Sequence, residues 1–246
     1  MQDISPLSYE AQAAAEAVHD RYWTRVLNPP RKVVTDEADD GKPRGHIALG
    51  LDLGFSVDHS ALCAVEAIDG GDDIGRVYAV RKLERWPLRT EYIDVIERTV
   101  EVYKRLRNKG HTCVVLMDVG GARGVWELAR DKNISAYAVN LIGSGTTRLH
   151  GSQLTIVKSD MASTLAILSN PNKPRLRVPK MAKYARELKT ELRQYEIHVS
   201  ASGSATFGAF GSSKNHDDLV SACGYALIYF ERFGGASPNR SRVSWL

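Results

Sequence analysis

The chain has 246 residues, of which 43% are hydrophobic and 25% are charged, and this composition is typical of a folded domain with a full core rather than of a disordered or fibrous chain. Its net charge of +4 permits a polyanionic partner but does not by itself indicate one. The three cysteines lie in apolar runs without CxxC spacing, which argues against a zinc site or a disulfide framework. No signal peptide or run of about 18 apolar residues occurs, so we expect an intracellular protein without membrane contact.

The chain divides by composition into three parts. An alanine-rich stretch over residues 8–26 predicts a helix, and a polar stretch over residues 32–44 predicts a linker. We therefore expect a helix and linker over residues 1–45, a core domain over residues 46–234 and a tail over residues 235–246.

The most informative stretch is HIALGLDLGFSVDHSAL, residues 46–62. Its apolar run is too short for a helix, lies between glycines and ends at Asp52, which predicts a strand. A second β-prone run over residues 61–68 predicts a hairpin with Asp52 at its edge. A carboxylate on a strand beside a glycine loop suits a hard cation, although an aspartate that caps a turn is the plainer alternative.

The following segments predict an α/β fold. Residues 111–117 form a continuous apolar strand that ends at Asp118 and precedes glycines and a helix, which is where open α/β sheets bind ligands. The other expected elements are strands over residues 75–86, 135–142 and 175–178, helices over residues 90–107, 158–169, 181–195 and 215–230, and a flexible loop over residues 143–151.

Two further carboxylates, Asp217 and Asp218, lie in the first turn of the last predicted helix. Acidic residues are favoured there by the helix dipole alone, so the pair has a purely structural explanation as well. If the strand that ends at Asp118 lies beside the strand that ends at Asp52, three carboxylates distant in sequence can meet. Such a group repels itself unless cations neutralise it, which favours two Mg²⁺ or Mn²⁺ ions about 4 Å apart and phosphodiester hydrolysis.

Basic residues cluster near the helix over residues 181–195 and predict phosphate contacts, with a solvated helix face as the alternative. The candidates for DNA contact are Arg175, Arg177, Lys180, Lys183, Arg186 and Arg148. His59 and His216 flank acidic positions and are candidates for proton transfer, although histidines in exposed loops are common.

Six segments together resemble the nuclease domain of the large terminase subunit of tailed bacteriophages: GLDLGFSVDHSAL, VVLMDVGGARG, KSDMASTLAIL, ELKTELRQYE, TFGAF and NHDDLVSACGYALIYF. The resemblance covers about residues 46–232. It implies a ribonuclease H-like fold, a mixed sheet of five or more strands flanked by helices. It also implies a metal-dependent endonuclease that cuts concatemeric viral DNA during genome packaging. By position, Asp52, Asp118 and Asp218 correspond to the metal-binding triad, Asp58 to an accessory acidic position, and Asp217 competes with Asp218.

The same resemblance implies two Mg²⁺ or Mn²⁺ ions as cofactors and double-stranded DNA, a terminase ATPase domain, the small terminase subunit and the portal as partners, in the cytoplasm of an infected host. No GxxxxGK[ST] phosphate loop occurs in the sequence. We therefore expect the nuclease half only, either as a fragment or as a separately encoded subunit.

Two other classes of function remain open at this stage. The GLDLG and DVGG segments also resemble the phosphate motifs of the actin, heat-shock ATPase and sugar-kinase superfamily, although those proteins need two such domains and an adenosine-binding glycine motif. A non-catalytic DNA-binding or motor-docking module is the other alternative. Its sign would be the loss of an acidic position, which is not seen.

Overall fold

The computed structural model describes residues 44–69, 75–120, 123–199, 205–209 and 216–234. The helix predicted over residues 8–26, the linker and the tail lie outside the described residues.

A mixed sheet of eight strands forms the centre of the described structure, in the order β6-β7-β5-β4-β1-β2-β3-β8. The strands β1, β2 and β3 form an antiparallel meander, β1, β4, β5 and β7 are mutually parallel, β6 is antiparallel to β7, and β8 is parallel to β3. Their bounds are β1 Arg44–Asp52, β2 Ala61–Asp69, β3 Arg76–Arg85, β4 His111–Asp118, β5 Ala136–Ile142, β6 Arg148–His150, β7 Gln153–Val157 and β8 Leu176–Arg177. A separate two-stranded hairpin comprises β9 Tyr195–Val199 and β10 Ala205–Ala209.

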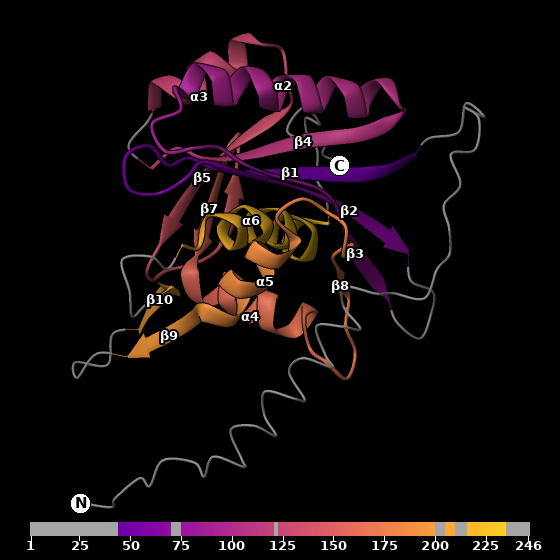
Figure 1. Ribbon diagram of the computed structural model, residues 1–246, viewed down its shortest axis with the longest axis vertical. Helices are drawn as coiled ribbons and strands as arrows, with labels where there is room; N and C mark the ends of the chain where they lie inside the picture. Colours follow the sequence, from indigo (N-terminus) through magenta and orange to yellow (C-terminus); the bar gives the residue numbers. More distant parts are fainter. Residues whose placement is uncertain (1–43, 70–74, 121–122, 200–204, 210–215, 235–246) are drawn as a thin grey trace, which may run out of the picture.

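Helices cover both faces of the sheet, so the described fold has three layers (Figure 1). On one face lie α2 Tyr92–Asn108 and α3 Arg123–Asp131. On the other lie α4 Lys158–Leu168, α5 Ala185–Gln194 and α6 Asp218–Phe233. None of the helices among the described residues is long and apolar enough to cross a membrane.

The central strand β1 is buried on both faces, and its two faces differ in side-chain size. Ile47, Leu49 and Leu51 belong to the core beneath α2 and α3. The alternate positions, Ala48 and Gly50, face α6, because successive residues of a strand point to opposite faces. Small residues on this face let α6 lie close to the sheet.

Gly50 is the point of closest approach between α6 and β1. A Cβ atom at Gly50 would lie 1.8 Å from the backbone oxygen of Ala222 in α6, far inside any permitted contact. The glycine is therefore required by the packing of the helix and not by a turn. The contact also sets the distance between α6 and the sheet at Asp52, which is two residues further along β1 and so lies on the same face.

The structure confirms most of the expected elements. The β1–β2 hairpin, the meander and the parallel pairing of β4 with β1 are present. Two local predictions are wrong. The helix expected to begin at Met181 begins at Ala185, and Met181 is 96% exposed instead of lying on the apolar face. The loop predicted over residues 143–151 contains the edge strand β6, which pairs with β7.

Candidate active site

Asp52 and Asp118 stand at the same end of neighbouring strands. Leu51 of β1 pairs with Met117 of β4 in a parallel register, so the next residue of each strand is an aspartate. Side chains alternate along a strand, and Val114 and Leu116 of β4 belong to the core under α6. Both aspartates therefore point to the α6 face, which confirms the neighbourhood predicted from the sequence.

Tyr225 of α6 bridges these two carboxylates. Its hydroxyl lies 3.1 Å from Asp52 Oδ1 and 3.3 Å from Asp118 Oδ2. The hydroxyl has a single proton and donates it to one carboxylate at a time. The other oxygen of Asp118, Oδ1, accepts the backbone N–H of Gly120 at 2.8 Å, which fixes the turn after β4.

The electrostatic surroundings of Asp52 disfavour its negative charge. Burial, followed by the negative charges of Asp118 and Asp218, raises the pKa of Asp52 well above its usual value, while the hydrogen bond from Tyr225 acts in the opposite direction. Burial, followed by the negative charges of Asp52 and Asp118, raises the pKa of Tyr225, which stays protonated. A cation beside Asp52 would relieve this repulsion.

The third carboxylate, Asp218, is the first residue of α6 and is 1% exposed. Its Oδ2 atom lies 3.1 Å from Nη2 of Arg85, at the end of β3. Burial raises the pKa of Asp218, while the positive charge of Arg85 opposes that shift. Asp217, its competitor, occupies the N-cap position of α6, makes no side-chain capping hydrogen bond, and acts on Asp52 more weakly than Asp218 does.

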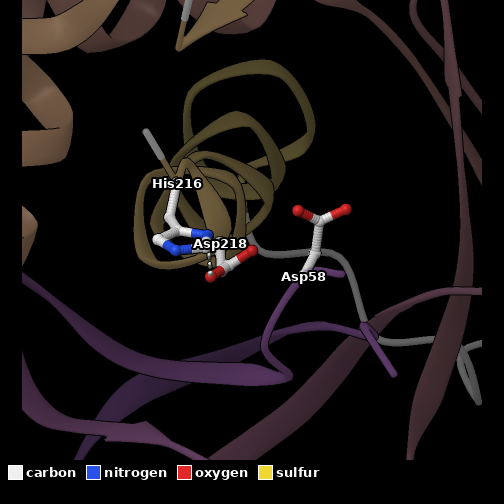
Figure 2. Close-up of side chains that lie close together, drawn as sticks. All are labelled: Asp58, His216 and Asp218. Carbon is white, nitrogen blue, oxygen red and sulfur yellow. Dashed lines mark ion pairs between the residues drawn. The ribbon is translucent and has the colours of Figure 1, made fainter. Parts of the chain in front are cut away.

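The loop between β1 and β2 brings Asp58 to the start of α6. Asp58, His216 and Asp218 each offer a ligand atom, and these atoms all lie within 4.8 Å of one another. Figure 2 shows the three side chains gathered at the N-terminal end of the helix, with His216 beside Asp218. The Nδ1 atom of His216 is buried and makes no hydrogen bond with any described residue.

The same loop is held by hydrogen bonds at its base. Ser60 Oγ donates to the carbonyl of Gly54 at 2.8 Å and accepts the N–H of Gly54 at 3.2 Å. The ring of His59 lies 5.1 Å from that of His216, centroid to centroid, and its Nδ1 donates to the carbonyl of Trp86 at 2.7 Å. The loop is thus fixed on both sides of Asp58.

These groups fit a divalent cation. Carboxylate oxygens are the ligands that Mg²⁺ and Mn²⁺ prefer, and a histidine nitrogen without a hydrogen bond is compatible with Mn²⁺ or a similar transition metal. The half-buried carboxylates of Asp52 and Asp118 repel each other, and His216 Nδ1 lies 4.0 Å from Oδ2 of the buried Asp218. Both features indicate a site shaped for positive charge.

The predicted DNA-contact residues are not brought together as one surface. Arg148 lies on β6 and Arg177 on β8, the two opposite edges of the sheet. Nη2 of Arg175 forms an ion pair with Oε2 of Glu231 at 3.1 Å, and its Nη1 contacts the carbonyl of Arg76 at the start of β3. Because Arg85, at the other end of β3, marks the end nearer Asp52, Arg175 lies at the end of the sheet away from Asp52.

The other predicted DNA-contact residues, Lys180, Lys183 and Arg186, are exposed. Lys183 Nζ lies 4.7 Å from the ring centre of Tyr184, and the Tyr184 hydroxyl donates to the carbonyl of Arg85 at 3.1 Å. This places Lys183 at the same end of β3 as the carboxylate group.

Three contributors to the site escaped the sequence-based prediction: Tyr225, Arg85 and Glu191. Tyr225 follows Asp218 by seven residues and so lies two helical turns along on the same face, a spacing that could have revealed it. Arg85 ends β3 in register with Ala61, which in turn pairs with Asp52, but only the strand register shows this. Glu191 was part of the ELKTEL segment without an assigned role.

No protein-family model and no curated protein matches the sequence. Solved structures do match the fold. The large terminase nuclease of the thermophilic phage G20c shares 22% identity at a TM-score of 0.54, over 78% of this chain and 84% of that one. The human cytomegalovirus terminase nuclease domain shares 11% identity at 0.54, over 87% and 95%.

This chain has the ribonuclease H-like fold of terminase nuclease domains. The large terminase of bacteriophage HK97 shows it too, with 14% identity and a TM-score of 0.52 over 84% of this chain and 42% of the longer HK97 chain. Among terminase nuclease structures, that of G20c has been solved with bound magnesium and with bound cobalt, and the cytomegalovirus domain was soaked with manganese. Identities of 11–22% show that this chain and the terminase nucleases share a fold, and nothing more.

Proposed function

We propose that this chain is a metal-dependent DNA endonuclease of the terminase type, which cuts concatemeric viral DNA during genome packaging. The observation that carries the proposal is the convergence of Asp52, Asp118 and Asp218 from three distant segments at one end of the sheet. Like charges this close together are stable only when protons or cations neutralise them. The terminase nuclease fold supports the assignment to DNA cleavage.

The carboxylates would hold two Mg²⁺ or Mn²⁺ ions. Asp52 and Asp118 would hold one, and Asp58, His216 and Asp218 would hold the other, with Asp217 next to the last of these. Ions so bound supply an activated water and stabilise the leaving oxygen of a phosphodiester.

We propose proton transfer as the role of His59. Its Nδ1–H is engaged by the Trp86 carbonyl, which leaves Nε2 as the acceptor nitrogen of the neutral ring. The ring stands beside His216, in the acidic group. In this proposal His59 takes or returns a proton at Nε2 during hydrolysis.

Double-stranded DNA is the proposed substrate, held through its phosphates by Lys180, Lys183 and Arg186. The terminase resemblance further supports an ATPase domain, a small terminase subunit and a portal as partners, in the cytoplasm of an infected host. These partners would bring DNA to the site, since hydrolysis at the carboxylates does not itself move DNA.

The test is nicking of supercoiled plasmid by the purified chain with Mn²⁺, with Mg²⁺ and with chelator, for wild type, Asp118→Ala and a control, Asp131→Ala. Asp131 is exposed at the end of α3, outside the site. We expect metal-dependent nicking by the wild type and the control, and none by Asp118→Ala at an unchanged far-UV circular dichroism spectrum. Equal nicking by folded Asp118→Ala would remove Asp118 from the mechanism.

Two other outcomes identify the alternative functions. DNA binding without nicking under any metal would indicate a docking module. ATP binding by the chain, measured by calorimetry, would instead favour the actin and sugar-kinase type of site.

A further inference from the structure

A buried ion network lies behind Asp218, and the proposed function does not use it. We propose that Arg85 and Glu191 are positioning residues, which hold the first turn of α6 and its carboxylate Asp218 in the orientation that binds metal. This inference rests on the proposed metal site but concerns residues that need not touch either metal or DNA.

Glu191 caps α6 from another helix. Its Oε2 accepts the backbone N–H groups of Leu219 at 2.8 Å and of Val220 at 3.1 Å. The first N–H groups of a helix have no partner within the helix and are usually satisfied by the N-cap side chain. Here the N-cap residue, Asp217, makes no such bond. A residue of α5 therefore does the capping, and the carboxylate of Asp218 contacts Arg85.

Arg85 joins this cap to the metal-binding carboxylate. Its Nη2 contacts both Oε1 of Glu191 and, at 3.1 Å, Oδ2 of Asp218. The side chains of Arg85, Glu191 and Asp218 are 14%, 5% and 1% exposed, so water does little to screen the contacts. The Tyr184 hydroxyl donates to the carbonyl of Arg85 and fixes the end of β3 from which the guanidinium extends.

The charges in the network explain why we expect both Arg85 and Glu191 to be needed to position Asp218. Two carboxylates share one guanidinium, so the positive charge of Arg85 is divided between Glu191 and Asp218. Removal of the charge on Glu191 would leave Arg85 to neutralise Asp218 alone and to compete with metal. It would also weaken the cap, because a neutral amide oxygen is a poorer acceptor than a carboxylate for two N–H groups.

The variant that tests the proposal is Glu191→Gln, with Glu187→Gln as its matched control. Glu187 lies one turn earlier in α5 and is exposed. Glutamine keeps the size of the side chain and one carbonyl oxygen for the cap. For Glu191→Gln we expect Mn²⁺ binding, measured by calorimetry, to weaken by about 10- to 100-fold, as for other residues that orient metal ligands. We expect faster amide hydrogen exchange at Leu219 and Val220 in the metal-free protein.

A purely structural role would give a different pattern. It would lower the melting temperature of Glu191→Gln but leave the Mn²⁺ dissociation constant of the folded protein unchanged. Arg85→Lys is the second variant, because lysine keeps the charge but replaces the planar guanidinium, whose Nη2 contacts both carboxylates, with a shorter and more flexible ammonium side chain. We expect it to weaken Mn²⁺ binding as well, with DNA affinity unchanged.

The two proposals can fail separately. A wild-type chain that binds Mn²⁺ without nicking plasmid would contradict the proposed nuclease. The positioning role would still be tested by comparing the Mn²⁺ affinity and the amide exchange of Glu191→Gln with those of the wild type. Unchanged Mn²⁺ affinity and unchanged exchange at Leu219 and Val220 in folded Glu191→Gln would overturn the positioning role. In a wild type that binds no Mn²⁺, unchanged exchange alone would overturn it.

Discussion

Replacement of Gly50 by alanine should separate α6 from β1 and so dismantle the site without removing any of its side chains. The added Cβ would lie 1.8 Å from the Ala222 carbonyl oxygen. Ordinary contact begins near 3.4 Å, so the helix must move by about 1.5 Å, because both atoms at the contact belong to rigid backbone elements. Tyr225 and Asp218 move with the helix.

The expected cost follows from this displacement. Insertion of a methyl group into a packed core costs about 1–3 kcal/mol, and we expect about 3 kcal/mol here because neither element yields easily. For a domain of this size that corresponds to a melting temperature lower by roughly 6–12 °C. A shift of about 1 Å in reacting groups costs on the order of 100-fold in rate, so nicking should fall at least that far.

The control is Gly224→Ala, on the same helix. Its Cβ would meet Cγ and Sδ of Met161 at 2.6 Å, atoms of a buried side chain that can change rotamer, whereas the contact at Gly50 is with backbone. Alanine is also favoured over glycine within a helix by about 1 kcal/mol. We expect stability close to wild type and retained nicking. Urea unfolding with chelator and plasmid nicking with Mn²⁺ measure both effects, and a Gly50→Ala protein with wild-type stability and nicking would refute the packing argument.

Three further predictions concern metal, charge and DNA. Mn²⁺ at about 100 times its dissociation constant should stabilise the chain by about 2.7 kcal/mol, or roughly 5–10 °C in a thermal-shift scan, and the absence of any rise at millimolar Mn²⁺ would contradict a preformed site. Asp52→Asn should raise the melting temperature in chelator and abolish the Mn²⁺-dependent rise. Because the pKa of Asp52 is raised in the folded state, its favourable contribution is present below the unfolded pKa and lost as pH rises through the folded pKa. The stability advantage of Asp52→Asn should therefore grow with pH in a series of urea titrations, and an advantage that shrinks with pH would contradict the sign. Lys183→Gln should weaken DNA binding and lower the magnitude of the slope of log affinity against log salt by about 1. Lys104→Gln, on α2 at the opposite face of the sheet, should leave both unchanged. Equal slopes for the two variants would exclude Lys183 from the DNA surface.

The sequence by itself determined the elements and the chemical character of the site. Apolar runs that end in Asp52 and Asp118 predict strands that carry carboxylates at their ends, since that pattern depends only on local periodicity and glycine turns. The helix that opens with Asp217 and Asp218 could be recognised for the same reason. Local propensity was less informative for residues 181–184, where the apolar spacing continues a helical pattern but the backbone begins its helix only at Ala185.

Only the tertiary structure decided which of these groups meet. Parallel pairing places Asp118 beside Asp52, and the close contact at Gly50 sets Tyr225 above both carboxylates. The network of Arg85 and Glu191 joins residues 106 positions apart in the chain. Two of the predicted DNA-contact residues, Arg148 and Arg177, lie on opposite edges of the sheet, which only the strand order reveals. Strand order and helix docking are long-range properties, which arise from burial of whole faces and leave no local signal at the residues that they bring together.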